Sequence, residues 1–117
     1  MSAAVTVGVD VGGTSTRIVV FDADGRDIAS RGLPTPHGGD ALTRLLAYEI
    51  VELAAPHGRL LHVGVGVPGR VTGRSTVAMA LNIGIGEGYD LAGALRAALH
   101  VPVVVENDVN AAAVGAY

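Results

Sequence analysis

The sequence predicts an α/β fold: a mixed five-stranded sheet with helices on both faces, in the order β-β-β-α-β-α-β-α. Residues 5–32 hold two apolar, β-rich segments and, after a hairpin turn, a third segment that completes an antiparallel meander. From residue 40 onward, helical spacing alternates with short apolar runs, which is typical of crossovers to parallel strands. The 117 residues, half of them hydrophobic, suit one domain over 1–117.

The first three strands are expected over 5–10, 14–21 and 26–32. Valine, isoleucine and phenylalanine dominate the first two, and the turn over 22–25 ends in Asp-Gly, which is a strong hairpin signal. Residues 33–39 hold two prolines and two glycines, so they favour neither a helix nor a central strand.

The second half of the chain contains the predicted helices. Asp40 is expected to cap the first helix, which ends before Pro56, and Asp90 is expected to cap the second. The other segments are expected over residues 60–67 (strand), 70–80 (irregular strand and turn), 82–89 (loop), 101–105 (buried strand) and 107–117 (helix).

Composition narrows the class of function. The net charge is −3 and the eight basic residues are scattered, so there is no patch of the kind that nucleic-acid binding needs. Cysteine is absent, which excludes disulfides and thiolate metal sites. No basic, apolar leader and no long apolar stretch is present, so we expect a cytoplasmic protein that does not associate with a membrane.

The turn after the first strand carries the most chemistry. Asp10 ends the strand, and Gly12, Gly13, Thr14 and Ser15 follow, with Thr16 adding another hydroxyl. Glycines let backbone N–H groups approach an anion closely, and a carboxylate beside phosphates would pair with a hydrated Mg²⁺. The segment therefore favours a nucleotide-phosphate turn, although an ordinary hairpin that uses glycine for positive φ is the alternative.

The segment over 64–69 formally matches the dinucleotide pattern G-x-G-x-x-G. We reject that interpretation because the first two glycines lie inside a strand and no helix opens after Gly69. Two interpretations remain for Gly64 and Gly66: a low floor under a ligand, or close packing of a helix on the strand.

The pair Asn107-Asp108 follows a buried strand and opens a helix. Asp108 could simply be a helix cap. Its functional interpretation is a general base that takes a proton from a substrate hydroxyl as the oxygen attacks phosphorus. Asn107 can both donate and accept, which suits neighbouring sugar hydroxyls.

Three segments together resemble the ROK family (repressor, open reading frame, kinase). They are the segment over 10–14, the Gly-Val-Pro-Gly over 66–69 and the Glu-Asn-Asp-Val-Asn-Ala-Ala-Ala over 106–113, with the Leu-Asn-Ile over 81–83 between them. The resemblance implies the ribonuclease-H-like N-terminal lobe of the actin/hexokinase superfamily. It also implies ATP-dependent phosphorylation of a hexose or an N-acetylhexosamine, with ATP and Mg²⁺ as cofactors.

The resemblance also assigns roles to residues. Asp108 is the expected catalytic base, and Asn107, Asn82 and Gly66 are the expected sugar contacts. The expected phosphate loop is Gly12, Gly13, Thr14 and Ser15, with Asp10 near Mg²⁺. The family often has lysine where this chain has Ser15, so no cationic phosphate contact is expected there.

The family's second lobe, with its adenosine loop and zinc cluster, would lie downstream of residue 117. We therefore expect the chain alone to be inactive, to bind ligand weakly and to self-associate to some degree. The four histidines lack the spacing of metal ligands, so no zinc site is expected here. Alternatives are the sugar-sensing lobe of a ROK regulator, whose DNA-binding segment would need more residues before the first strand, or a non-catalytic binding or assembly domain.

Overall fold

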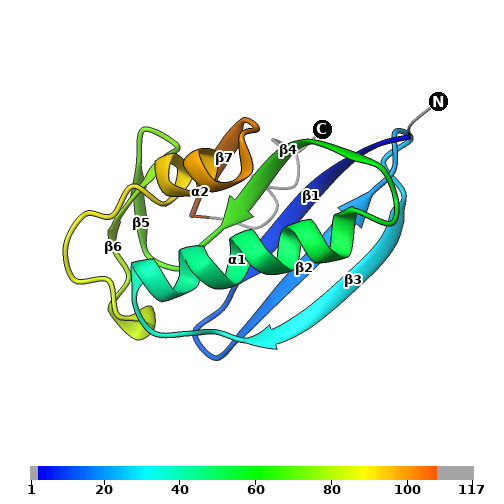
Figure 1. Cartoon of the computed structure of the whole chain (residues 1–117). Coiled ribbons are helices and arrows are strands. Elements are labelled where there is room, and N and C mark those ends of the chain that lie inside the picture. Colours follow the sequence, from blue (N-terminus) through cyan, green and yellow to red (C-terminus); the bar gives the residue numbers. More distant parts are fainter. Residues whose placement is uncertain (1–2, 108–117) are drawn as a thin grey trace.

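The structure of the protein, a computed structural model, describes residues 3–107. Five strands form one sheet in the order β3-β2-β1-β4-β7 (Figure 1). Their bounds are Ala4–Val11 (β1), Ser15–Phe21 (β2), Asp27–Pro34 (β3), Arg59–Gly66 (β4) and Val103–Glu106 (β7). The first three strands pair antiparallel, whereas β4 and β7 add in parallel. The predicted mixed five-stranded sheet is confirmed.

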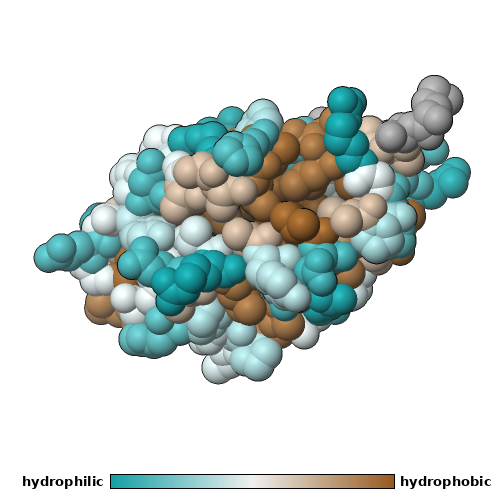
Figure 2. All heavy atoms as spheres, viewed as in Figure 1, coloured by the Kyte–Doolittle hydropathy of each residue, from teal (hydrophilic) through white to brown (hydrophobic). Residues whose placement is uncertain are grey.

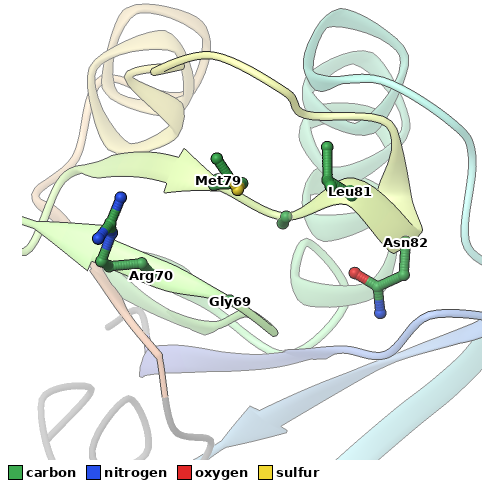
Figure 3. Close-up of a pocket in the computed structure, with 6 residues that line it drawn as sticks. Gly69, Arg70, Met79, Leu81 and Asn82 are labelled. Atoms are coloured by element: carbon green, nitrogen blue, oxygen red, sulfur yellow. The ribbon is translucent and has the colours of Figure 1, made fainter.

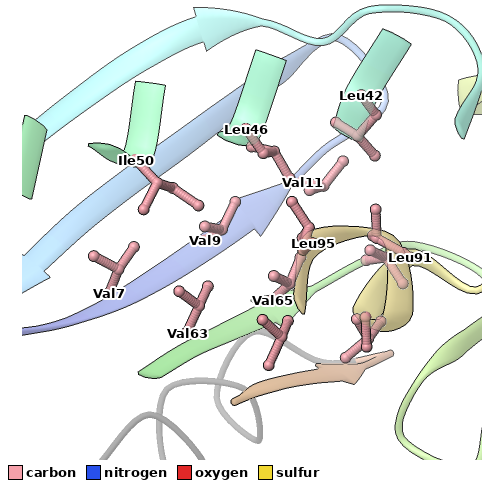
Figure 4. Close-up of a cluster of buried hydrophobic side chains, with 14 of the residues drawn as sticks. Val7, Val9, Val11, Leu42, Leu46, Ile50, Val63, Val65, Leu91 and Leu95 are labelled. Atoms are coloured by element: carbon pink, nitrogen blue, oxygen red, sulfur yellow. The ribbon is translucent and has the colours of Figure 1, made fainter. Parts of the chain in front are cut away.

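The described helices, α1 (Gly39–Ala54) and α2 (Leu91–Leu99), lie side by side on one face of this sheet (Figure 1). Their leucines and isoleucine point at alternate valines of β1 and β4, and together they form the core (Figure 4). Removing these side chains from water is the main stabilising term. The helix expected over 107–117 lies, apart from Asn107, outside the described residues.

The start of α1 differs from the prediction. Gly38, not Asp40, is the N-cap residue, and no side chain caps the helix. Asp40 lies in the first turn, where its negative charge favours the helix dipole, and it accepts a hydrogen bond from the Tyr89 hydroxyl at 3.1 Å. Asp90 caps α2 as predicted, because its carboxylate accepts the Gly93 N–H at 2.9 Å.

The irregular stretch after β4 is a small antiparallel hairpin, β5 (Arg70–Thr72) and β6 (Thr76–Met79). The expected loop after it begins with a 3-10 turn, η1 (Leu81–Ile83), and returns to pair Tyr89 with Val77 of β6. The hairpin lies past the carboxyl end of β4, at the left of Figure 1.

The opposite end of the sheet carries an apolar groove of about 230 Å³. It is lined by Val51, Ala54, Ala55, Gly58, Leu60, Leu99 and Val101. Figure 2 shows this hydrophobic surface between α1 and the start of β4. Among residues 3–107, no helix is long and apolar enough to cross a membrane.

Candidate functional site

The carboxyl ends of the three parallel strands meet in one row. Asp10 of β1 is the register partner of Gly66 of β4, and Gly66 is the partner of Glu106 of β7. Alternation along a strand puts the neighbouring residues Val9 and Val65 in the core, so the row lies on the face away from α1 and α2. Asp10 is exposed and Glu106 is half-buried. The row therefore presents two carboxylates on either side of a residue without a side chain.

The turn between β1 and β2 is tight for a steric reason. The Gly12 N–H donates to the Ser15 carbonyl at 2.9 Å, and a Cβ on Gly12 would lie only 2.8 Å from that oxygen. Neither Gly12 nor Gly13 has positive φ, so these two glycines are not there to supply positive φ to an ordinary hairpin. Thr14 and Ser15 are exposed at the tip. Asp10, at the same end of the β1–β2 hairpin, is exposed as well.

Thr16 does not join the exposed donors of this turn. Its side chain is buried, and its hydroxyl lies 2.8 Å from the Thr35 hydroxyl. Thr35 also donates its hydroxyl to the Gly12 carbonyl at 2.8 Å and its N–H to the Thr14 carbonyl at 3.0 Å. Sequence reasoning missed Thr35 as the residue that supports the turn. Its position before Pro36, which favours an extended backbone, was the available signal.

Asn82 lies against the same turn. A Cβ on Gly13 would come within 3.1 Å of the Asn82 side-chain nitrogen, so η1 and the β1–β2 turn are in contact. Asn82 also lines a cavity of about 530 Å³ with Gly69, Arg70, Met79, Ala80 and Leu81. Figure 3 shows the Asn82 amide pointing toward β1 and β2, while Met79 and Leu81 project away from it. The structure thus places Asn82 between the turn and this open cavity.

The remaining predicted residues lie at the ends of β4 and β7. Gly66 is buried and Asn107 is exposed directly after β7. Asp108, the predicted base, lies outside the described residues, so its placement stays a prediction. Of the predicted set, the structure brings together Asp10 and Gly66 in one row, and Gly13 and Asn82 in one contact. Asn107 is joined to that row through Glu106.

The donor set is compatible with Mg²⁺ carried by phosphates. Within residues 3–107, no three His, Asp or Glu side chains gather into a metal-binding group. Mg²⁺ usually keeps several waters and takes one or two carboxylates plus phosphate oxygens, so one exposed carboxylate beside an open turn is sufficient. Asp10 would hold the ion through its carboxylate, and the turn of Gly12 to Ser15 would face the phosphates.

Known proteins resemble this chain over nearly all of its length. The ROK family profile matches residues 6–117. A glucokinase of Streptomyces coelicolor is 40% identical over 113 residues, which are 96% of this chain and 35% of that protein. An N-acetyl-D-glucosamine kinase of Pectobacterium atrosepticum is 34% identical over 104 residues, which are 88% of this chain and 34% of that protein.

The fold agrees with the sequence match. The crystal structure of a ROK family glucokinase from Streptomyces griseus, in complex with glucose and AMPPNP, superposes with a TM-score of 0.80 at 33% identity. The superposed region covers 92% of this chain and 34% of the Streptomyces griseus chain. The chain spans about a third of the length of the relatives that it matches. The resemblance drawn from the three sequence segments is confirmed: the chain belongs to the ROK family, and its fold is that of the N-terminal lobe of these kinases.

Proposed function

We propose that this chain is the N-terminal lobe of an ATP-dependent sugar kinase, which transfers the terminal phosphoryl group of ATP to a hydroxyl of a hexose or an N-acetylhexosamine. The observation that carries the proposal is the row of Asp10, Gly66 and Glu106. It joins the phosphate-type turn to the strand end that leads into Asn107. The names of the two curated relatives support the two sugar classes.

Each residue has a role in this proposal. The Gly12, Gly13, Thr14 and Ser15 turn faces the phosphates, and Asp10 holds Mg²⁺. The ion, when bound, neutralises charge on the phosphate oxygens. Asn82 and Asn107 orient sugar hydroxyls, and Gly66 keeps the floor between them low.

Asp108 accepts the proton of the attacking sugar hydroxyl. The sugar oxygen then bonds to the terminal phosphorus of ATP, and the bond from that phosphorus to the bridging oxygen breaks, which releases ADP. Because such a transfer needs mainly positioning and charge stabilisation, one carboxylate within hydrogen-bond reach of the hydroxyl is enough.

The activity requires a second lobe, as the relatives' length implies. Lobe closure over the ligands excludes water and completes the site in kinases of two lobes. We therefore propose that the 117-residue chain alone does not turn over, and that its exposed inter-lobe surface favours weak self-association.

Turnover by the Asp108→Asn variant of the full-length protein tests the proposal. ADP release with glucose or with N-acetylglucosamine should fall by about 10²- to 10⁴-fold, the usual contribution of a general base. Asp24→Asn, which changes an exposed turn carboxylate far from the row, is the matched control and should keep full turnover. Undiminished turnover in Asp108→Asn would contradict the assigned base. A wild-type protein that binds sugar but phosphorylates neither one would favour the regulator instead.

A further inference from the structure

The turn between β5 and β6 is hydrogen-bonded to the last two residues of β7. Arg74, in this turn, accepts the Val105 N–H on its backbone carbonyl at 2.8 Å. Its guanidinium Nε also donates to the Glu106 carboxylate. Two consecutive residues of one strand are thus bound by a single residue from a hairpin some thirty positions earlier in the chain.

These bonds complete a support on both sides of the strand end. On its other side, β7 pairs with β4, and the Glu106 carbonyl accepts the Val67 N–H at 2.9 Å. An edge strand normally leaves one row of backbone groups unpaired. Here the Arg74 carbonyl takes the N–H of Val105 on that outer side. The next two residues along the chain are Asn107 and Asp108.

The hairpin that carries Arg74 is itself anchored. The Ser75 hydroxyl donates to the carboxylate of Asp90, the cap of α2, and the Ser75 carbonyl accepts the Ala92 N–H at 3.1 Å. Val77 and Tyr89 exchange backbone hydrogen bonds at 2.8 and 2.9 Å. The β5–β6 turn is therefore anchored to the start of α2, and Arg74 in this turn holds the end of β7 in place.

Stability alone does not account for this arrangement. The Arg74 side chain is 61% exposed and that of Glu106 is 22% exposed. An ion pair that is this exposed to solvent contributes little to the free energy of folding. Arg74 has a φ of +54° and Gly73 a φ of +61°, and the Ser75 N–H donates to the Thr72 carbonyl at 3.2 Å, so the positive φ of Arg74 follows from the hairpin turn. The exposed ion pair to Glu106 is better explained by placement of the segment that follows β7.

We propose that Arg74 is a positioning residue: through Val105 and Glu106 it fixes the end of β7, and thereby Asn107, for phosphoryl transfer. The inference rests on the proposed function, because it assumes that Asn107 contacts the sugar. A small displacement of a reacting group lowers the rate strongly even when folding is intact.

Arg74→Gly in the full-length protein is the test. Glycine adopts positive φ without strain, so the turn and its carbonyl are kept while the guanidinium is lost. We expect kcat to fall by about ten- to hundredfold, with the KM for ATP changed by less than about twofold, because the phosphate turn lies on β1 and β2. Arg74→Lys, which keeps a cation near Glu106, should recover part of the lost kcat. Hydrogen exchange of the amides over 104–107 should become faster in Arg74→Gly.

Arg31→Ala is the matched control, because it removes a second exposed ion pair, to Glu49, that lies between β3 and α1. Its kcat should equal that of the wild type. Unchanged kcat in Arg74→Gly, or an equal loss in Arg31→Ala, overturns this inference alone. A wild-type protein without any turnover overturns the proposed function, and with it the positioning role. Faster exchange would then show only that Arg74 holds the strand end.

Discussion

The two faces of β1 differ in what they contribute. Val5, Val7, Val9 and Val11 are all buried toward α1 and α2. The residues between them face the other way: Thr6 is buried there as well, and Asp10, near the strand end, is exposed. Near its carboxyl end, alternate positions of this eight-residue strand therefore divide the core from the proposed phosphate site.

The difference teaches how this lobe separates stability from function. On the helix side, every β1 position is a β-branched residue packed against helix side chains, so shape and volume matter there. On the other side, the row of Asp10, Gly66 and Glu106 has charge and an absence of bulk as its useful properties. Substitutions on the two faces should therefore have separable effects, which Leu46→Ala and Asp10→Asn test.

The largest effect is expected from Leu46→Ala, on the helix side. Leu46 is fully buried in α1, and its truncation should lower the free energy of unfolding by about 2–5 kcal/mol. Denaturant unfolding of the full-length protein measures this. The control is Tyr48→Ala on the same helix, where the side chain is 63% exposed and the change should stay within about 0.5 kcal/mol. Equal losses in both variants would show that the buried face is not what stabilises the lobe.

Asp10→Asn should have the opposite profile. The midpoint of thermal unfolding should not change, because the side chain is exposed. The rate of Mg²⁺-dependent ADP release should fall by about hundredfold, the scale for removing one charge-stabilising group from a transition state. Steady-state kinetics over a range of Mg²⁺ concentrations would check this, beside Asp24→Asn. A variant that kept its turnover would remove Asp10 from the proposed metal site.

The smallest effect is expected at the cap of α2, which joins the helix layer to the β5–β6 hairpin. The Ser75 hydroxyl, followed by the Gly93 N–H, holds the pKa of Asp90 below its usual range. Because the pKa of Asp90 is lower in the folded than in the unfolded state, its ionisation stabilises the fold at pH values above the ordinary pKa of aspartate. This contribution is lost as the pH falls below about 4. Asp90→Ala should cost about 0.5–2 kcal/mol at pH 7.

Urea unfolding at pH 7 and at successively lower pH measures that difference. The gap between wild type and Asp90→Ala should narrow as the pH falls below about 4. A gap that stays constant with pH would mean that the charge of Asp90 contributes nothing beyond the shape of the cap.

Much of the fold followed from the sequence because its signals are local. Alternating valines marked β1, and the leucine spacing of α1 marked its buried face. The first helix start was wrong because Asp40 has the chemistry of a cap, but the chain enters the helix through Gly38, whose φ is +99°. An acidic residue in the first turn and one at the cap look the same in a sequence.

The candidate site was predicted in part. Asp10 was expected to end the first strand and Gly66 to lie inside a later strand, but the sequence did not show that the two are register partners. Thr35 and Arg74 were missed because their roles depend on contacts across many residues, namely Thr35 with the β1–β2 turn and Arg74 with β7. The sequence around a polar residue in a surface turn does not indicate whether that residue has a distant hydrogen-bond partner.

The row of Asp10, Gly66 and Glu106 has a consequence for the stage of folding at which this lobe could first bind a ligand. Its three members come from strands that are distant in sequence and become adjacent only after both helical crossovers have closed. Parallel pairing of distant strands forms slowly, because the chain loses conformational entropy before the stabilising contacts between the strands are made. A nascent chain that has completed only the meander displays Asp10 without its neighbours, so the first appearance of ligand affinity would report the moment at which the entire sheet is assembled.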